Sequence, residues 1–140
     1  MTVAIIGSRS FDNYDLLKSV MSPFIPQIKE IVSGGAKGAD ELGAMWSHEF
    51  LNQAPIIIRP QWNDLNHPNA LIKTDKNGQA FDVRAGLRRN ELIVQQADLV
   101  IAFWDETSKG TRHAINFAKK LGKTVQVIKF RQNHQITLPF

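Results

Sequence analysis

Five short apolar runs, separated by stretches of helical periodicity, constrain this chain more than any other feature of its sequence. The runs predict strands at residues 3–6, 30–33, 56–58, 99–103 and 124–128. Continuous apolar runs are typical of strands that are buried on both faces. Because parallel neighbours need crossover connections, the alternation predicts an α/β fold. We expect a single Rossmann-like domain, with an open, mainly parallel five-stranded sheet in the order 3-2-1-4-5 and helices on both faces.

The stretches between these runs predict four helices. The first has an apolar face at residues 16–21 and follows Asp12 and Asn13, either of which is a suitable N-cap. The other helices are expected at residues 39–51, 86–96 and 110–121.

One long segment, residues 59–85, lacks periodicity and is rich in proline, asparagine and glycine. A loop of this length in a small domain is usually functional or mobile. We expect a lid or a loop at the edge of a ligand site, with a short hairpin at residues 76–78. The Rossmann-like domain is assigned to residues 1–130, and residues 131–140 form a tail. Apolar residues alternate in this tail, as in an edge strand, at Ile136, Leu138 and Phe140.

Composition limits the possible classes of function. The chain has 140 residues, of which 43% are hydrophobic, so it can bury a core without staples. It has no cysteine, which excludes disulfides and thiolate metal sites and fits a cytoplasmic location. No apolar run approaches the roughly 20 residues that span a bilayer, and no histidine–carboxylate spacing predicts a metal site. The net charge of +4 admits anionic partners, including nucleic acid.

Three polar loops follow strands whose carboxyl ends meet near the switch in strand order. They lie at residues 7–9, 33–40 and 104–112. In the first loop, Ser8 offers a hydroxyl and Arg9 a planar fork that suits phosphate. In the third loop, hydroxyls, a glycine and two cations open a helix, whose N-terminus favours an anion. Ligands of open α/β sheets bind at this edge, so the loops together predict a phosphate-binding site.

The second loop contains a glycine turn, Gly-Gly-Ala-Lys-Gly at residues 34–38. Glycine permits a sharp turn and a close approach to a ligand, and the helix that follows offers free N–H groups. The alternative is a tight turn whose glycines serve only the packing of helix against strand. Taken alone, the turn favours packing, whereas its place beside the other two loops favours phosphate.

Further candidates surround these loops. Arg89 and Asn90, at the start of the third helix, add a cation and an amide. Trp104 is favoured to stack on a base, whereas Trp62 is expected to anchor the long loop. The residues predicted to bind the ligand are Gly7, Ser8, Arg9, Ser33, Gly34, Gly35, Ala36, Lys37, Gly38, Asp40, Arg89, Asn90, Trp104, Ser108, Lys109, Gly110, Thr111 and Arg112.

The order and spacing of several segments also match a known family. The segments are AIIGSR at residues 4–9, VSGGAKGAD at 32–40, AGLRRNE at 85–91, AFWD at 102–105 and KGTR at 109–112. In them the chain resembles the YspA/YpsA-related branch of the SLOG superfamily, which includes the LOG phosphoribohydrolases and the Rossmann-like domain of DprA. The resemblance implies a nucleotide-binding Rossmann-like fold, relatives in bacterial and phage systems, and self-association as a homodimer or larger homo-oligomer.

The resemblance also bears on catalysis. LOG enzymes carry a Pro-Gly-Gly-x-Gly-Thr-x-x-Glu pattern whose glutamate is catalytic, and the matching position here is Ala114. No catalytic residue is therefore predicted, and Asp40 and Glu91 are the candidate carboxylates if cleavage occurs. Asp40 lies in the first turn of a helix, where a carboxylate also stabilises the helix by capping, and this role is favoured.

The leading hypothesis is therefore the binding of a nucleotide or nucleotide-derived ligand, for sensing or sequestration, with no further cofactor. Two alternatives stay open. The first is a nucleoside-monophosphate phosphoribohydrolase of the LOG type. The second is single-stranded nucleic-acid binding as in DprA, whose segments are similar to those at residues 7–9 and 33–40.

Overall fold

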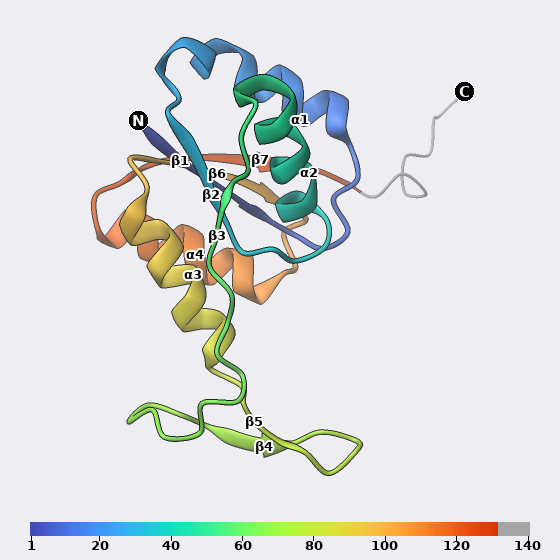
Figure 1. Ribbon diagram of the computed structural model, residues 1–140, viewed down its shortest axis with the longest axis vertical. Coiled ribbons are helices and arrows are strands. Elements are labelled where there is room, and N and C mark those ends of the chain that lie inside the picture. The colour runs from blue at the N-terminus through green and yellow to red at the C-terminus, as the bar shows by residue number, and fades with distance from the viewer. Residues whose placement is uncertain (132–140) are drawn as a thin grey trace.

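A sheet of five parallel strands forms the centre of the computed structural model, which describes residues 1–131 (Figure 1). The strands are β1 (Thr2–Gly7), β2 (Glu30–Ser33), β3 (Ile56–Ile57), β6 (Leu99–Trp104) and β7 (Thr124–Lys129). Their order is β3-β2-β1-β6-β7, and every neighbouring pair is parallel. The predicted α/β fold and strand order are thus confirmed. Since β1 and β6 flank the switch point, their carboxyl ends are where a ligand of this fold binds.

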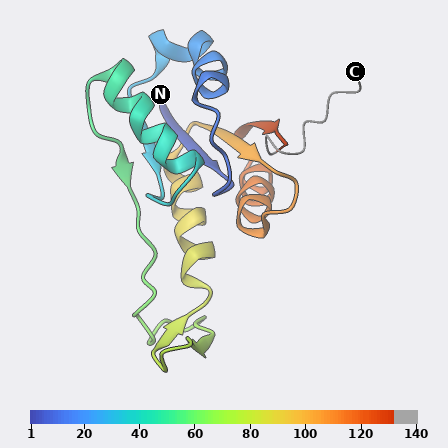
Figure 2. The same cartoon turned by 90° about the vertical axis from the view of Figure 1, so that its right-hand side faces the viewer.

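Helices cover both faces of the sheet, as Figures 1 and 2 show. Val3 and Ile5 of β1 join the buried cluster beneath the first two helices, whereas Ala4 and Ile6 join the cluster beneath the last two. This alternation follows from the period of a strand, in which successive side chains point to opposite faces. The helices are α1 (Tyr14–Met21), η1 (Ser22–Gln27), α2 (Ala39–Trp46), η2 (Ser47–Leu51), α3 (Ala85–Gln96) and α4 (Lys109–Lys120).

The helix ends follow their capping signals. Asn13 Oδ1 accepts a hydrogen bond from the Leu16 N–H at 3.0 Å, so Asn13 and not Asp12 is the cap of α1. The helix predicted at residues 39–51 is divided into α2 and a wider final turn, η2, which ends at Asn52 in the left-handed conformation. The edge strand predicted near the C-terminus lies outside the described residues.

Residues 59–84 leave the sheet and form an arm that points away from the body (Figures 1 and 2). Its centre is an antiparallel hairpin of β4 (Ile72–Thr74) and β5 (Ala80–Asp82). The predicted hairpin is confirmed. Asp75 Oδ1 accepts hydrogen bonds from two N–H groups of the turn, and Gly78 has a φ of +82°, which favours glycine. Because the hairpin lies away from the body, it does not cover the sheet as a lid would.

One buried carboxylate, that of Asp82, fastens the base of the arm. It accepts hydrogen bonds from the N–H groups of Leu71 at 2.9 Å and Arg84 at 3.0 Å, and it pairs with the Arg88 guanidinium of α3. Burial alone raises the pKa of Asp82, but these donors outweigh burial and bring the pKa to about 2. The carboxylate is therefore ionised at neutral pH and joins the arm to α3.

Candidate functional site

The main cavity, a space of about 500 Å³, opens at the carboxyl ends of β1 and β6. Buried side chains of Ile6, Ile93 and Ala114 form its apolar floor. Its walls come from the loop after β1, the N-terminal parts of α3 and α4, and the base of the arm. The volume falls in the range of small-molecule and cofactor sites, roughly 300–1,000 Å³.

The loop after β1 forms one wall. A Cβ atom at Gly7 would collide with a carbonyl oxygen of β6 and with Ala39 of α2, so glycine alone lets the chain pass between them. The Ser8 Oγ accepts a hydrogen bond from the Asp105 N–H at 3.1 Å, and the Ser8 carbonyl accepts one from the Ala39 N–H at 3.3 Å. The exposed Arg9 therefore extends from a backbone that is fixed on both sides.

The glycine turn at residues 34–38 is bonded to a side chain of its own helix. Asp40 Oδ2 accepts a hydrogen bond from the Ala36 N–H at 3.0 Å, so a donor of the turn is already engaged. Gly38 has a φ of +82°, and a Cβ atom there would lie 2.5 Å from the Ser8 carbonyl oxygen. The turn is thus packed against the first loop and presents only Ala36 and Asp40 to the main cavity.

Arg89 joins α3 to this turn. Its Nη1 donates to the Gly34 carbonyl at 2.7 Å, and its Nε donates to Asn90 Oδ1 at 2.9 Å. Burial raises the pKa of Asp40, although a backbone N–H and the Arg89 charge oppose this shift. Burial also lowers the pKa of Arg89. The charge of Asp40 opposes this shift, and the charge of Arg9 adds to it. Two arginines thus face one cavity, and an anion between them would relieve their repulsion.

The N-terminus of α4 forms the opposite wall. Ser108 is its cap, since the Ser108 Oγ accepts a hydrogen bond from the Thr111 N–H at 3.5 Å. Asp105 Oδ1 accepts a bond from the Ser108 N–H at 2.8 Å. Burial raises the pKa of Asp105, but the N–H groups of Ser108 and Thr107 outweigh burial and lower it overall. The first N–H groups of a helix lack partners within the helix, so this wall offers donors to an anion.

The structure brings only part of the predicted site to the main cavity. The predicted residues that line it are Gly7, Ser8, Arg9, Ala36, Asp40, Arg89, Asn90, Ser108, Gly110 and Thr111. The predicted residues that do not line it are Ser33, Gly34, Gly35, Lys37, Gly38, Trp104, Lys109 and Arg112. Ser33 is buried in β2, whereas Lys37, Lys109 and Arg112 are exposed outside the cavity.

The two loop tryptophans lie in different surroundings. The Trp104 Nε1 donates to the Ser108 carbonyl at 3.1 Å, and the Arg112 guanidinium covers the Trp104 ring at 5.7 Å from its centroid. Trp62 of the arm lines the main cavity instead and packs close to Gly86. The preference for Trp104 is therefore corrected, because its ring is already covered within its own loop and helix.

Sequence reasoning missed Leu87 and Ile93, which also line the main cavity. Each lies three residues from Asn90, and residues three apart share one face of a helix. The spacing around Asn90 is therefore the signal that could have found them.

The second candidate carboxylate, Glu91, lies away from the main cavity. Its Oε2 is 2.8 Å from His113 Nε2, so α3 and α4 are joined through this pair. Asp40 and Glu91 therefore do not share one site. Within residues 1–131, no group of three or more His, Cys, Asp or Glu side chains is arranged to hold a metal ion. None of the helices in this part of the chain is long and apolar enough to cross a membrane.

Comparisons with known proteins find relatives in phages and prophages. No family model matches the chain. It is 29% identical over 99 residues to the uncharacterized SPbeta prophage-derived protein YoqJ of Bacillus subtilis. This match covers 68% of this chain and 55% of that protein. It is 32% identical over 105 residues to the Gene 61 protein of Mycobacterium phage D29, which covers 71% of this chain and 70% of that protein. The match to YoqJ thus spans about half the length of that relative.

A solved structure shares the fold. It is DNA processing protein A (DprA) from Helicobacter pylori, whose structure was described for its single-stranded DNA binding mode. The similarity has a TM-score of 0.65 at 24% identity, and it covers 95% of this chain and 67% of that chain. This likeness shows the Rossmann-like fold.

Proposed function

The chain belongs to the family of the Gene 61 protein of Mycobacterium phage D29, and we propose that it binds a nucleotide or nucleotide-derived ligand in the main cavity. The observation that carries the proposal is the convergence of Arg9, Arg89 and the N-terminus of α4 on one cavity with an apolar floor. Guanidinium groups and helix N-termini are common partners of phosphate. Apolar and aromatic side chains are common partners of a base.

In this proposal each part of the ligand meets a different wall. The phosphate lies between Arg9 and the first turn of α4, where Ser108 and Thr111 add hydroxyls. The base lies against Trp62 and Leu87, which line the same cavity. The ionised Asp105 accepts hydrogen bonds from ribose hydroxyls or from the base, because a carboxylate has no donor to offer a phosphate.

We propose binding rather than cleavage. The glutamate of the LOG pattern corresponds to Ala114, which is buried in the floor. The Asp40 carboxylate is engaged by the Ala36 N–H, and Glu91 is paired with His113. Membership of the YspA/YpsA-related branch of the SLOG superfamily and self-association as a homo-oligomer are part of the same proposal.

Isothermal titration calorimetry against 5′-mononucleotides, cyclic dinucleotides and ADP-ribose tests the proposal. We expect one of these ligands to bind at one site per chain. Arg9→Gln should weaken binding at least tenfold, about 1.4 kcal/mol, because it removes a charged donor to phosphate. Lys120→Gln is the matched control, since it removes one positive charge at the far end of α4. No binding of any ligand by folded protein, or equal losses in both variants, contradicts the proposal.

A second candidate function is single-stranded DNA binding. It is favoured by the shared fold with DprA, a protein described with a single-stranded DNA binding mode, and by the net charge of +4. Phosphate contacts release counterions, so the affinity for a labelled oligothymidine should fall steeply between about 50 and 200 mM salt. Fluorescence anisotropy with oligothymidines of increasing length distinguishes the candidates. A nucleotide site alone gives no dependence on length.

A further inference from the structure

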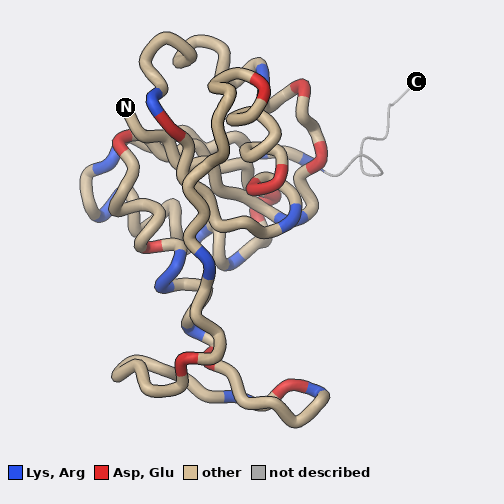
Figure 3. Tube along the Cα trace, viewed as in Figure 1, with Lys and Arg blue, Asp and Glu red and all other residues tan. Residues whose placement is uncertain are grey.

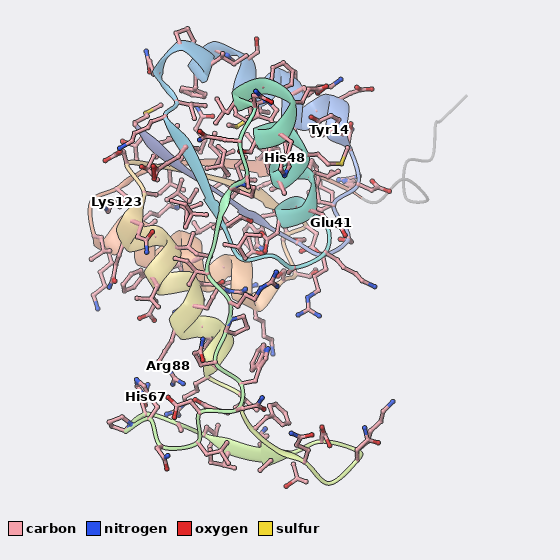
Figure 4. All side chains as sticks on the ribbon, in the orientation of Figure 1. Tyr14, Glu41, His48, His67, Arg88 and Lys123 are labelled. Atoms are coloured by element: carbon pink, nitrogen blue, oxygen red, sulfur yellow. The ribbon has the colours of Figure 1, made fainter. Side chains whose placement is uncertain are left out.

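A second hollow, the side cavity, lies between the base of the arm and α3. Its volume is about 320 Å³. The arginines Arg59, Arg88 and Arg89 line it, together with His67. Figure 4 shows Arg88 below α3 and His67 next to it on the arm, and Figure 3 shows basic positions gathered along the neck between body and arm. The side cavity is therefore lined by several guanidinium groups beside apolar side chains.

Arg88 brings a buried nitrogen without a partner. Its Nη2 pairs with Asp82, whereas its Nη1 is buried and has no hydrogen-bond partner within residues 1–131. A buried donor left unpaired costs roughly 1–3 kcal/mol, and more when it is charged. Such a group in a native protein usually indicates a bound water or ion. Arg88 is also one of the residues that line the side cavity.

The carboxylates of the side cavity have donors of their own. Glu91 is 2.8 Å from His113, and Asp64 Oδ1 accepts a hydrogen bond from the Asn66 N–H at 3.2 Å. Within the described residues, no carboxylate lies at ion-pair distance from Arg59. Arg59 is thus a positive group of this cavity that an anion would neutralise, whereas the charge of Arg88 is already balanced by Asp82 and its Nη1 is left as a donor.

A third hollow, of about 300 Å³, shares lining residues with both cavities. Arg59 and Arg89 line both this hollow and the side cavity, whereas Trp62 and Arg89 line both this hollow and the main cavity. Arg59 lies close to the glycine turn, since a Cβ atom at Gly35 would lie 3.1 Å from its Nη1. Arginines therefore continue from the main cavity to the side cavity in the order Arg9, Arg89, Arg59 and Arg88.

We propose that the side cavity is a phosphate subsite, in which Arg59 and Arg88 hold a phosphate group of the ligand that occupies the main cavity. This inference rests on the proposed function and narrows its ligand class. The ligand carries two phosphates that are separated by a nucleoside, one terminal and one in a phosphodiester linkage, as in a linear dinucleotide. One phosphate lies at Arg9, and the next lies at Arg59 and Arg88.

Calorimetry with the linear dinucleotide pApA, with AMP and with inorganic phosphate tests this inference on the full chain. Arg88→Lys keeps a cation for Asp82 but lacks Nη1, and Arg59→Gln removes the second cation without touching Asp82. We expect each variant to weaken pApA binding tenfold or more and to change AMP binding less than twofold. Lys120→Gln, which lies outside both cavities, should leave both affinities unchanged.

Four outcomes overturn the subsite. In the first, AMP binds to the wild-type chain as tightly as pApA does. In the second, the affinity for pApA is the same in Arg59→Gln as in the wild type. In both cases the proposal of a ligand in the main cavity stands. In a further outcome, inorganic phosphate binds the wild type but not Arg88→Lys, and the wild type does not bind pApA more tightly than AMP. This outcome would show that the side cavity is a site for free phosphate. If neither AMP nor pApA binds, the subsite falls, and the cyclic dinucleotides and ADP-ribose still decide the proposed function. Limited proteolysis checks that the arm of Arg88→Lys stays docked. If the arm of this variant is detached, the result with Arg59→Gln alone decides whether the subsite exists.

Discussion

The sheet domain and the arm each contain a glycine with the same backbone angle, held in different ways. Gly38 and Gly78 both have a φ of +82°. At Gly38, a Cβ atom would lie 2.5 Å from the carbonyl oxygens of Ser8 and Arg9, whereas at Gly78 no atom of residues 1–131 would lie within 4 Å of it. The same backbone conformation is therefore held by tertiary packing at Gly38 in the domain, whereas at Gly78 in the arm it is held by the local hydrogen bonds of Asp75.

The same contrast holds for the stability of the two regions. The domain has buried apolar clusters on both faces of its sheet. The arm exposes Leu65, Leu71 and Ile72 by 40%, 42% and 44%, and it depends on the polar contacts of Asp82. Regions with few buried apolar contacts open at lower free energy than the core. The arm should thus detach locally while the domain stays folded, although both regions contribute walls to the main cavity.

The largest effect is expected from Gly38→Ala. The new methyl group meets backbone atoms of the loop after β1, and alanine is strained at this φ. We expect a loss of about 3 kcal/mol or more in the free energy of unfolding, measured by urea denaturation.

Gly78→Ala is the matched control. It introduces the same strain at the tip of the arm without any collision, so the cost should be about 1 kcal/mol and confined to the hairpin. Equal losses of global stability in the two variants would show that packing around Gly38 is not what distinguishes the domain from the arm.

A smaller and local effect is expected from acid. The pKa of Asp82 in the folded chain is about 2, below the value of about 3.9 for an unfolded aspartate. Because the pKa is lower in the folded chain, the ionised carboxylate stabilises the docked arm at any pH above the pKa of the unfolded chain. This stabilisation is lost as the pH falls from about 4 to about 2. Hydrogen exchange of the Leu71 and Arg84 amides, followed by mass spectrometry, should show faster exchange in that range after correction for intrinsic rates.

Asp82→Asn is the control for this titration. It keeps an acceptor for the N–H groups of Leu71 and Arg84 but removes the charge that pairs with Arg88. Exchange in the arm should be faster than in the wild type at neutral pH, and its additional acceleration below pH 4 should disappear. An acid response that persists in Asp82→Asn would assign the docking of the arm to other groups.

The sequence predicted the domain better than the arm for a physical reason. Apolar runs and the rules for parallel crossovers determine the strand order, so the three polar loops were expected at one edge of the sheet. Which side chains contact the polar loops depends on distances in the folded structure, and these distances do not follow from the apolar pattern. Asp40 bonds to the Ala36 N–H, and Arg112 covers Trp104, so these parts of the predicted site are partly occupied by the protein itself.

The base of the arm could not be predicted from periodicity. Trp62 reaches the main cavity because a β hairpin returns the chain to α3, and the Asp82 carboxylate then holds both segments. The pairing of Asp82 with Arg88 has no periodic pattern in the sequence, since it crosses from a strand into a helix. Wherever a single buried polar group determines the position of a segment, hydrophobic patterning carries no signal of it.

An effect on binding, and not on folding, distinguishes the two tryptophans. Trp62→Ala removes the aromatic wall of the main cavity and should weaken binding of the nucleotide that calorimetry identifies by about 1–2 kcal/mol, the contribution of one base stacked on an aromatic ring. Trp104→Ala should reduce the melting temperature, because Trp104 packs beside a buried cluster, but should leave the affinity nearly unchanged. Since Trp62 belongs to the arm and Trp104 to the domain, the opposite result would mean that the domain binds its ligand without the arm.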